Sequence, residues 1–324
     1  MPLDGPLRGP GRAALCFDRT VPRSLVHKDS VAEVFLTDAQ PVPEDRILVA
    51  AQWPRTHTLY RPDRLGCADP LMLIETVRQA AIYLAHALHG VPRPHRFIFS
   101  GLDVQLDNHE FTRFTDGPVR AVLDCRYEGA TVRGRHRGSL SCLVEVSGRP
   151  VGRATARLTA VDEGLYRQLR DRSRPGEPGG ESVRSGGTEP LTADQAGRAG
   201  TDNVVLARSE HGLVVRVDPG HPGYFEHRSD HLPGMVLIEA FRQAAHDLVR
   251  DPNPGLAGRP VPLWLSGLSV VFGSFAELGV DVVVTAEQEE VDGAPRGGVA
   301  LKAFQGGTSV AHGTATFVPA LLQG

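Results

Sequence analysis

An internal repeat limits what this 324-residue chain can fold into. Residues 73–81 read LIETVRQAA and residues 237–245 read LIEAFRQAA, so seven of nine positions are identical. The same offset of 164 residues relates two further pairs of identical residues, His57 with His221 and Tyr60 with Tyr224. Repeated segments in the same order and at a near-constant spacing indicate a duplicated domain. Because both copies share these histidines, a structural role suits them at least as well as catalysis.

Two segments of unusual composition, together with the two copies of the repeat, divide the chain into four parts. Residues 1–15 are rich in Pro, Gly and Arg and have no periodicity, which predicts a disordered tail. Residues 166–200 contain little that can be buried, which predicts a flexible linker. We therefore expect an N-terminal domain over residues 16–165 and a C-terminal domain over residues 201–320.

Each copy has the same expected layout, in which strands precede and follow one helix. The helices are expected over residues 69–89 and about 233–249, and the last strands over 140–160 and 297–318. Both helices are apolar on nearly all sides, which is typical of a helix that is buried all round. A long buried helix wrapped by an antiparallel sheet is the hotdog arrangement. The predicted fold class is therefore α+β, with two tandem hotdog domains that pair as a pseudo-dimer.

The charge balance excludes several classes of protein. Lys and Arg number 35 and Asp and Glu 38, for a formal charge of −3, which argues against binding to nucleic acid or to an anionic membrane surface. The chain has no apolar run near the ~18 residues that a membrane span needs, and its N-terminus lacks the apolar core of a signal peptide. We expect a cytoplasmic protein. Its four cysteines have no zinc-binding spacing, so we expect no metal site.

Three polar side chains interrupt each apolar helix. They are Glu75, Arg78 and Gln79 in the first copy, and Glu239, Arg242 and Gln243 in the second. Spacings of three and four residues place each trio on one helix face. One interpretation is a Glu–Arg ion pair that ties the helix to a neighbouring loop, since buried charges are costly unless they are paired. The other is a polar pocket at the domain interface, where the carboxylate does acid–base work and the guanidinium holds an anion.

The second copy carries more potential chemistry just before its helix. Residues 225–242 read FEHRSDHLPGMVLIEAFR, whereas the first copy has RLGCADPLM at its helix start. His227 and His231 could each act as a general base or serve as a structural hydrogen bonder. A Pro-Gly pair opens the helix at Gly234. We therefore expect unpaired N–H groups near Met235 that could stabilise a thioester oxyanion.

Four segments of the chain resemble the AfsA family, the A-factor-type γ-butyrolactone synthases. They are VHKDSVAEVFLTD (26–38), VAAQWPRTHTLY (49–60), DPLMLIETVRQAA (69–81) and DHLPGMVLIEAFRQAA (230–245), and they occur in the family's order. The resemblance covers about residues 24 to 318. It implies transfer of a β-ketoacyl group from acyl carrier protein, or from acyl-CoA, to the hydroxyl of dihydroxyacetone phosphate. Cyclisation to a butenolide phosphate would follow, and no cofactor is needed.

The resemblance also implies which residues matter. The family's important Glu and Arg map onto Glu239 and Arg242, and in the first motif onto Glu75 and Arg78. We predict that the catalytic residues are Glu239, Arg242, His227 and His231. We predict that the substrate-binding residues are Glu75, Arg78, Gln79, Gln243, Gly234 and Met235. In this hypothesis His227 or Glu239 removes the hydroxyl proton, and Arg242, alone or with Arg78, binds the phosphate.

Other interpretations stay open at this level. The chain could be an acyl-thioester dehydratase or thioesterase, could make a related furan or butenolide signal, or could be a non-catalytic acyl-binding protein. Glu239 lies where hotdog dehydratases place a catalytic acid, but FEHRSDH replaces their GHFP sequence. The basic text RGRHR at residues 133–137 predicts a loop, either solvated or docked on an acidic carrier protein. A monomer with pseudo-dimeric domains and a homodimer are both plausible.

Overall fold

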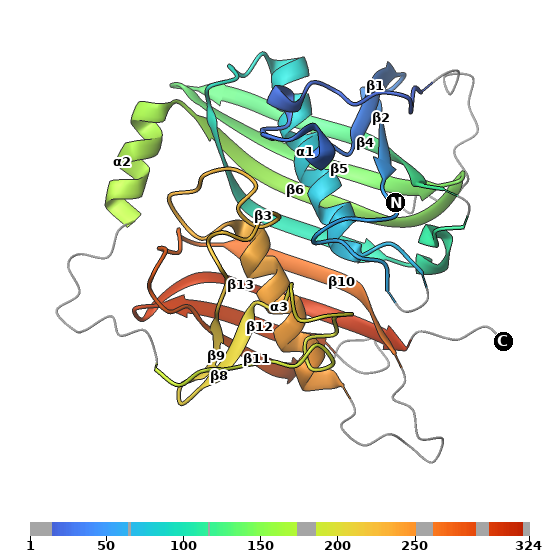
Figure 1. Ribbon diagram of the computed structural model, residues 1–324. Helices are drawn as coiled ribbons and strands as arrows, with labels where there is room; N and C mark the ends of the chain where they lie inside the picture. The colour runs from blue at the N-terminus through green and yellow to red at the C-terminus, as the bar shows by residue number, and fades with distance from the viewer. Residues whose placement is uncertain are drawn as a thin grey trace. The chain divides into compact units, whose positions relative to one another are not determined.

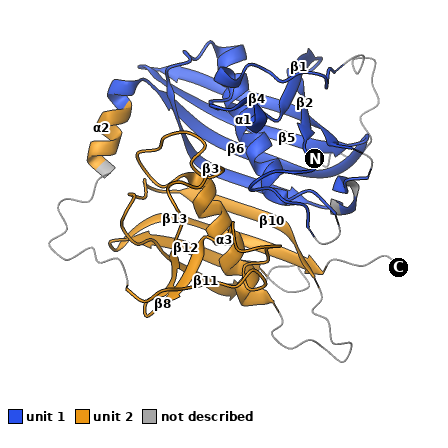
Figure 2. Cartoon of the chain, in the orientation of Figure 1, with its two compact units in different colours: residues 1–165 blue, residues 166–324 orange. Residues whose placement is uncertain are grey.

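The chain forms two compact units, residues 1–165 and residues 166–324 (Figure 2). The computed structural model describes residues 15–63, 66–115, 117–173, 186–250, 262–289 and 298–319. All but the last residue of the predicted N-terminal tail lies outside these ranges. Each unit contains one copy of the repeat.

Six described strands form the antiparallel sheet of the N-terminal unit, in the order β1-β2-β4-β5-β6-β3. Their bounds are β1 Leu36–Val42, β2 Arg46–Trp53, β3 Arg96–Leu106, β4 Val119–Val132, β5 Arg135–Val146 and β6 Arg149–Val161. Short 3-10 helices cover Arg23–Leu25, Val31–Glu33 and His109–Thr112. Helix α1 (Pro70–His89) packs against β4, β5 and β6 (Figure 1).

Helix α1 begins and ends where its sequence provides caps. The Asp69 carboxylate accepts a hydrogen bond of 2.9 Å from the Leu71 N–H, and Pro70 occupies the first turn, where it has no N–H to leave unpaired. Gly90 ends the helix in the left-handed conformation at φ +60°, which glycine adopts without steric cost. Most side chains between these ends are buried, as predicted from the all-round apolar sequence.

The C-terminal unit repeats this plan with seven described strands, in the order β10-β13-β12-β11-β9-β8-β7. Their bounds are β7 Glu189–Pro190, β8 Leu206–Ser209, β9 Gly212–Val215, β10 Leu263–Phe272, β11 Val283–Glu289, β12 Gly298–Gln305 and β13 Thr308–Pro319. Helix α2 (Glu163–Ser173) leads into the unit, and helix α3 (Gly234–Val249) packs against β10 to β13 (Figure 1). The prediction of two tandem hotdog domains is confirmed. Their pairing as a pseudo-dimer stays a prediction.

Two long strands expected from the sequence are each broken by a tight turn. The segment 140–160 belongs to β5 and β6, and Ser147 and Gly148 turn the chain between them with φ of +53° and +75°. In the second copy, segment 297–318 is divided into β12 and β13 by Gly306 and Gly307, both with positive φ. Two adjacent residues with positive φ make a two-residue hairpin whose twist matches the strands. The sequence expectation overlooked this turn chemistry.

The predicted flexible linker over residues 166–200 differs from the structure at both of its ends. Helix α2 continues to Ser173, and residues 186–200 include strand β7 together with the buried side chains of Leu191, Ala196 and Arg198. Residues 174–185 of the predicted linker lie outside the described ranges. Within the described part of the chain, no helix is both long and apolar enough to cross a membrane.

Candidate active site

In α1, the carboxylate of Glu75 is fully buried and bonded through both oxygens. Arg78 donates to it through Nε and Nη2 at 2.7 and 2.9 Å, Gln79 Nε2 donates at 2.9 Å, and Lys28 Nζ lies 3.1 Å from Oε1. Burial raises the pKa of Glu75. The positive charges of Arg78 and Lys28 outweigh it and hold the pKa well below the usual range. Glu75 is therefore ionised, and every part of its carboxylate already has a partner.

Gln79 fastens α1 to the segment that precedes β1. Its Nε2 donates to the carbonyl of Glu33 at 2.8 Å, and its Oε1 accepts from the N–H of Phe35 at 2.9 Å. A side-chain amide that bonds both a carbonyl and an N–H satisfies buried backbone groups that would otherwise be costly. In the N-terminal unit the trio therefore matches the interpretation of an ion pair that ties the helix to its neighbours.

The same arrangement recurs on α3. Gln243 Nε2 donates to the carbonyl of Asn203 at 2.8 Å and to Glu239, and Gln243 Oε1 accepts from the N–H of Val205 at 3.0 Å. Arg242 Nη2 donates to Glu239 Oε1 at 2.8 Å. Arg198 Nε lies 3.1 Å from the same oxygen, so it takes the place that Lys28 has beside Glu75.

The two carboxylates differ in their second oxygen. Oε2 of Glu239 is buried and has no hydrogen-bond partner among the described residues, whereas Oε2 of Glu75 receives Arg78. A buried acceptor without a partner costs about 1–3 kcal/mol, and more when it is charged. An uncompensated buried oxygen on a carboxylate fixed through its other oxygen is what a proton acceptor for a bound substrate requires.

The two histidines shared by the copies hold turns in place. His57 Nδ1 lies 3.1 and 3.3 Å from the N–H groups of Leu59 and Tyr60, so it accepts, and Nε2 faces Glu33 at 3.2 Å. His221 Nδ1 likewise accepts from the Tyr224 N–H at 3.3 Å, and its Nε2 faces Asn203 Oδ1 at 3.1 Å. Both ring nitrogens are occupied in each case, which favours the structural role.

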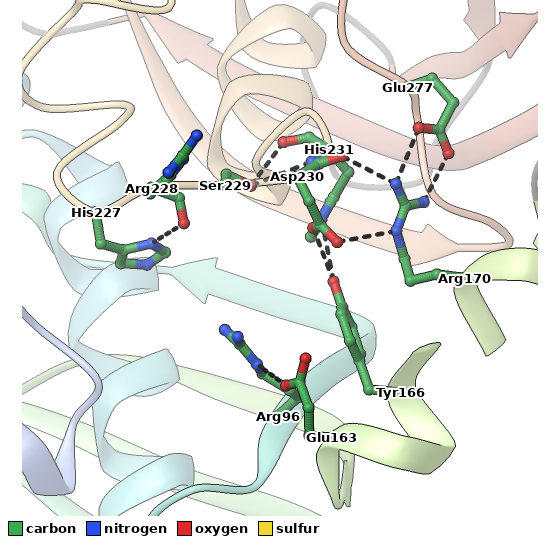
Figure 3. Close-up of polar contacts among 10 residues, drawn as sticks. All are labelled: Arg96, Glu163, Tyr166, Arg170, His227, Arg228, Ser229, Asp230, His231 and Glu277. Atoms are coloured by element: carbon green, nitrogen blue, oxygen red, sulfur yellow. Dashed lines mark hydrogen bonds and ion pairs between the residues drawn. The ribbon is translucent and has the colours of Figure 1, made fainter. Parts of the chain in front are cut away.

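His231 lies in a polar cluster that has no counterpart in the sequence before α1. Its Nδ1 is 2.7 Å from Asp230 Oδ1, which also accepts from the Tyr166 hydroxyl at 2.9 Å (Figure 3). A carboxylate only accepts, so Nδ1 carries the proton, and in the neutral ring Nε2 is the basic nitrogen. Burial lowers the pKa of His231 despite the nearby Asp230 charge. The ring edge packs against Phe275 at a centroid distance of 4.9 Å.

Arg170 of α2 holds Asp230 in place. Its guanidinium is buried and makes two hydrogen bonds to Glu277, at 2.6 and 2.9 Å. It also donates to the Asp230 carboxylate at 3.3 Å and to the Asp230 carbonyl at 2.9 Å, and it lies over the Phe275 ring. Burial raises the pKa of Asp230, but hydrogen bonds from His231 and Tyr166 prevail and lower it to about 2. Asp230 is therefore an anion that orients His231.

The structure does not bring either predicted histidine into contact with Glu239. His227 is exposed, its nearest polar partner is the Arg228 carbonyl at 3.4 Å, and Figure 3 shows it apart from the Arg170 cluster. Within the described ranges, no hydrogen bond or ring contact joins His227 or His231 to Glu239. Sequence positions alone could not reveal this separation.

The start of α3 differs from the start of α1. Pro233 is its N-cap and makes no side-chain hydrogen bond, whereas Asp69 caps α1. The first N–H groups of α3, at Gly234 and Met235, therefore have no capping side chain, and a helix N-terminus carries a partial positive charge. This end of the helix could hold an anionic oxygen. Across the described residues, no group of three His, Cys, Asp or Glu side chains is placed to hold a metal ion.

Several residues of these networks were not predicted. Lys28 and Arg198 both lie outside the repeated helix motif, and Arg198 falls in the predicted linker. Tyr166, Arg170 and Glu277 come from segments with no recognisable motif. One sequence feature could have pointed to these two counterions. Lys28 and Arg198 are separated by 170 residues, which is close to the repeat offset of 164.

Comparisons with known proteins give a consistent picture. The family model described as "A-factor biosynthesis hotdog domain" matches residues 12–162 and 186–320. A "2-oxo-3-(phosphooxy)propyl 3-oxoalkanoate synthase" of Streptomyces virginiae is 34% identical over 272 residues, 83% of this chain and 87% of that protein. A protein of the same description from Streptomyces coelicolor is 35% identical over 246 residues, 72% of this chain and 74% of that protein.

Among solved structures, a pyran synthase domain from the sorangicin pathway matches with a TM-score of 0.48 at 15% identity, covering 89% of this chain and 98% of that domain. An acyl-ACP thioesterase from Bacteroides thetaiotaomicron matches with a TM-score of 0.46 at 11% identity, covering 84% of this chain and 98% of that protein.

Proposed function

Since this chain belongs to the AfsA family of A-factor biosynthesis hotdog proteins, we propose that it is the acyltransferase that makes a 2-oxo-3-(phosphooxy)propyl 3-oxoalkanoate. The alcohol part of that ester is dihydroxyacetone phosphate, and the acid part is a 3-oxoacyl group. The enzyme joins the two, and the ester then cyclises to a butenolide phosphate. The acyl donor is a thioester on acyl carrier protein, with acyl-CoA as the simpler equivalent.

The single observation that supports a reaction centre on α3 is the state of Glu239. Its Oε1 is anchored by Arg198, Arg242 and Gln243, and its buried Oε2 has no partner among the described residues. Anchoring fixes the direction in which Oε2 points. A fixed, desolvated carboxylate oxygen can accept the proton of a bound hydroxyl without a reorganisation cost at the moment of reaction. General base assistance of this kind contributes typically about 10²–10⁴ in rate.

The chemical step follows from these groups. Glu239 Oε2 takes the proton of the primary hydroxyl, and the hydroxyl oxygen attacks the thioester carbonyl carbon. The N–H groups at Gly234 and Met235 stabilise the oxyanion of the tetrahedral intermediate. The C–S bond then breaks, the ester is released, and the proton ends on the departing thiol. Arg242, the cation next to Glu239 on α3, binds the phosphate, which suits the planar guanidinium.

The two histidines differ in their suitability for this step. His231 precedes the α3 N-terminus by three residues, and Asp230 holds it with Nε2 as the basic nitrogen. We therefore prefer it to His227 as a second proton-handling residue near the start of α3. His227 is exposed, and its one polar partner among the described residues is the neighbouring Arg228 carbonyl, which makes it the weaker of the two predicted bases.

Mass spectrometry of the purified protein with a 3-oxoacyl thioester tests the proposal. Reactions are run with dihydroxyacetone phosphate, with dihydroxyacetone that lacks the phosphate, and with neither. We expect the phosphorylated ester or its butenolide only in the first reaction. Free acid or loss of water in all three reactions would instead indicate a thioesterase or a dehydratase, and would contradict the acyltransferase.

A further inference from the structure

A row of arginines marks the face of the N-terminal sheet that lies opposite α1. Arg126 on β4, Arg137 on β5, and Arg153 and Arg157 on β6 are all exposed. Strand alternation turns these side chains away from α1, because their neighbours Cys125, His136, Ala154 and Ala156 are buried. The strand registers place Ser139, Ser141, Thr155 and Thr159 between them.

Within the described part of the chain, most of these arginines form no ion pair. Among the described residues, no carboxylate lies within ion-pair distance of Arg137, Arg153 or Arg157. Arg153 donates only to the neutral amide of Gln105, and Arg126 has one carboxylate, that of Glu44, at 3.9 Å. The registers also place two carboxylates on this face, Asp103 beside Thr155 and Glu128 beside Ser139. Four guanidiniums against two carboxylates leave an excess of positive charge, which would attract an anionic surface.

The fold does not require arginine at these positions, as the second copy shows. Arg157 pairs across strands with Gly101 and Ser139, and its guanidinium lies over the bare backbone of Gly101. In the C-terminal unit the residue paired with the equivalent Gly267 is Thr316. Likewise, the residue four positions before Thr316 on β13 is His312, where β6 has Arg153. Arg153 and Arg157 of β6 therefore have no arginine counterpart on β13.

The dimensions of this face suit a helix. Adjacent strands lie ~4.8 Å apart, so β4 to β6 span about 10 Å, and four residues along β6 separate Arg153 from Arg157 by about 13 Å. An α-helix with its side chains is about 10–12 Å across. A single acidic helix laid on β4, β5 and β6 could contact all four guanidiniums.

We propose that the arginine face formed by Arg126, Arg137, Arg153 and Arg157 docks the acidic surface of the carrier protein that delivers the acyl thioester. The inference rests on the proposed function, which requires a thioester donor. It differs from the basic segment 133–137 considered from the sequence. Arg133 and Gly134 form the turn between β4 and β5, and His136 of that segment is buried. Only Arg137 of that segment belongs to the docking face.

The test compares two donors with the double variant Arg153→Glu/Arg157→Glu. One donor is the 3-oxoacyl carrier protein, and the other is the same acyl group on N-acetylcysteamine, which reports the chemistry without docking. The proposal expects KM for the carrier-protein donor to rise about tenfold or more, while turnover of the small thioester stays at the parent value. Lys302→Glu, on the corresponding face of the C-terminal unit, is the matched control and should leave both donors unaffected.

Three results would overturn the docking face. They are an unchanged KM for the carrier-protein donor in the variant, an equal loss with both donors, and an equal rise in KM for Lys302→Glu. A parent enzyme that turns over neither donor refutes the acyltransferase itself, which is a separate failure.

If the double glutamate variant does not fold, two other measurements test the docking face. They are the KM of Arg153→Gln/Arg157→Gln for the carrier-protein donor and the salt dependence of the same KM in the parent. The parent's KM for the carrier-protein donor should rise between about 50 and about 300 mM salt, because exposed charges are screened over that range. A KM that does not respond to salt, together with an unaffected glutamine variant, would overturn the proposal.

Discussion

Glu75 and Glu239 occupy the same position of a repeated sequence but have different hydrogen-bond environments. Around Glu75, Arg78 donates through two nitrogens and Lys28 approaches as a compact ammonium, so both oxygens are used. Around Glu239, Arg242 and Gln243 donate to Oε1 and Arg198 lies 3.1 Å from it, whereas Oε2 has no hydrogen-bond partner among the described residues. The same residue type at the same repeat position therefore has a different hydrogen-bond environment in each copy, and the cations around the carboxylate determine that environment.

Replacing Glu75 by Gln should affect stability. The change leaves the buried ammonium of Lys28 and the partly buried guanidinium of Arg78 beside a neutral amide, and breaking a buried ion pair typically costs about 3–5 kcal/mol. Denaturant unfolding of Glu75→Gln should therefore show a lower free energy of unfolding by about that amount. Exposed Glu210, changed to Gln, is the control and should stay within about 0.5 kcal/mol of the parent. Equal stability of Glu75→Gln and the parent would show that this network is not structural.

Sequence reasoning identified the two trios, because polar residues at helical spacing are conspicuous in an apolar helix. It did not identify Lys28 or Arg198, since each reaches its carboxylate from a distant part of the chain. It also predicted His227 and His231 equally as catalytic residues. Only the hydrogen bond from His231 to Asp230, and the exposure of His227, separate them.

Like the short strand β7, helix α2 lies mostly in the predicted linker. Its residues Tyr166 and Arg170 bind Asp230, and Arg170 also binds Glu277. A charged sequence such as LRDRSR does not indicate burial. Burying an arginine is costly unless carboxylates pair with it, and here those carboxylates come from distant parts of the chain. In contrast, the Ser147-Gly148 pair does indicate the turn between β5 and β6. The prediction missed this turn because it treated the two flanking strands as one continuous strand.

Arg170→Met should loosen α2 from the segment before α3. The variant leaves Glu277 and Asp230 without their shared cation, so we expect a loss of about 3–5 kcal/mol in the free energy of unfolding. Arg172→Met, at an exposed position on the same helix, should change it by less than about 0.5 kcal/mol. Proteolysis of α2 should be faster in Arg170→Met only. Similar stability for the two variants would contradict the bracing role of Arg170.

The N-cap of α1 gives a second prediction for an element. Asp69→Ala removes the acceptor of the Leu71 N–H inside a buried helix end, which should cost about 0.5–2 kcal/mol. Asp69→Asn keeps an acceptor and should recover most of this loss. A chemical denaturation series of the three proteins measures both effects, and an alanine variant as stable as the parent would show that the cap is dispensable.

For the whole molecule, duplication explains both what was predictable and what was not. Two copies of one motif at a constant offset predict two similar domains, and an all-round apolar helix predicts the hotdog arrangement inside each. The copies differ in the contacts around the repeated motif. Among the described residues, the unpartnered oxygen of Glu239 and the Asp230–His231 pair occur in the C-terminal unit and have no equivalent around Glu75 or before α1. Such differences depend on contacts that no single-sequence pattern encodes.

Acid should destabilise the protein well before its carboxylates are protonated. Burial lowers the pKa of five histidines in the folded state, namely His86, His136, His221, His231 and His246. The unfolded chain, with histidine pKa near 6.5, then binds more protons than the folded chain as the pH falls below that value. The melting temperature should therefore decrease from about pH 7.5 to about pH 5.5. A melting temperature that is constant or rises over that range would contradict this assignment of neutral buried histidines.

The most direct test of the account is the rate of phosphate-dependent ester formation by Glu239→Gln. Glutamine keeps the shape of the side chain and an acceptor for Arg198 and Arg242, but it cannot take a proton. We predict a fall of about 10²–10⁴ in the initial rate, measured on protein whose far-UV circular dichroism and cooperative melt show that it is folded. A folded Glu239→Gln protein that forms the ester at the parent rate would contradict the claim that this carboxylate is the base of the reaction.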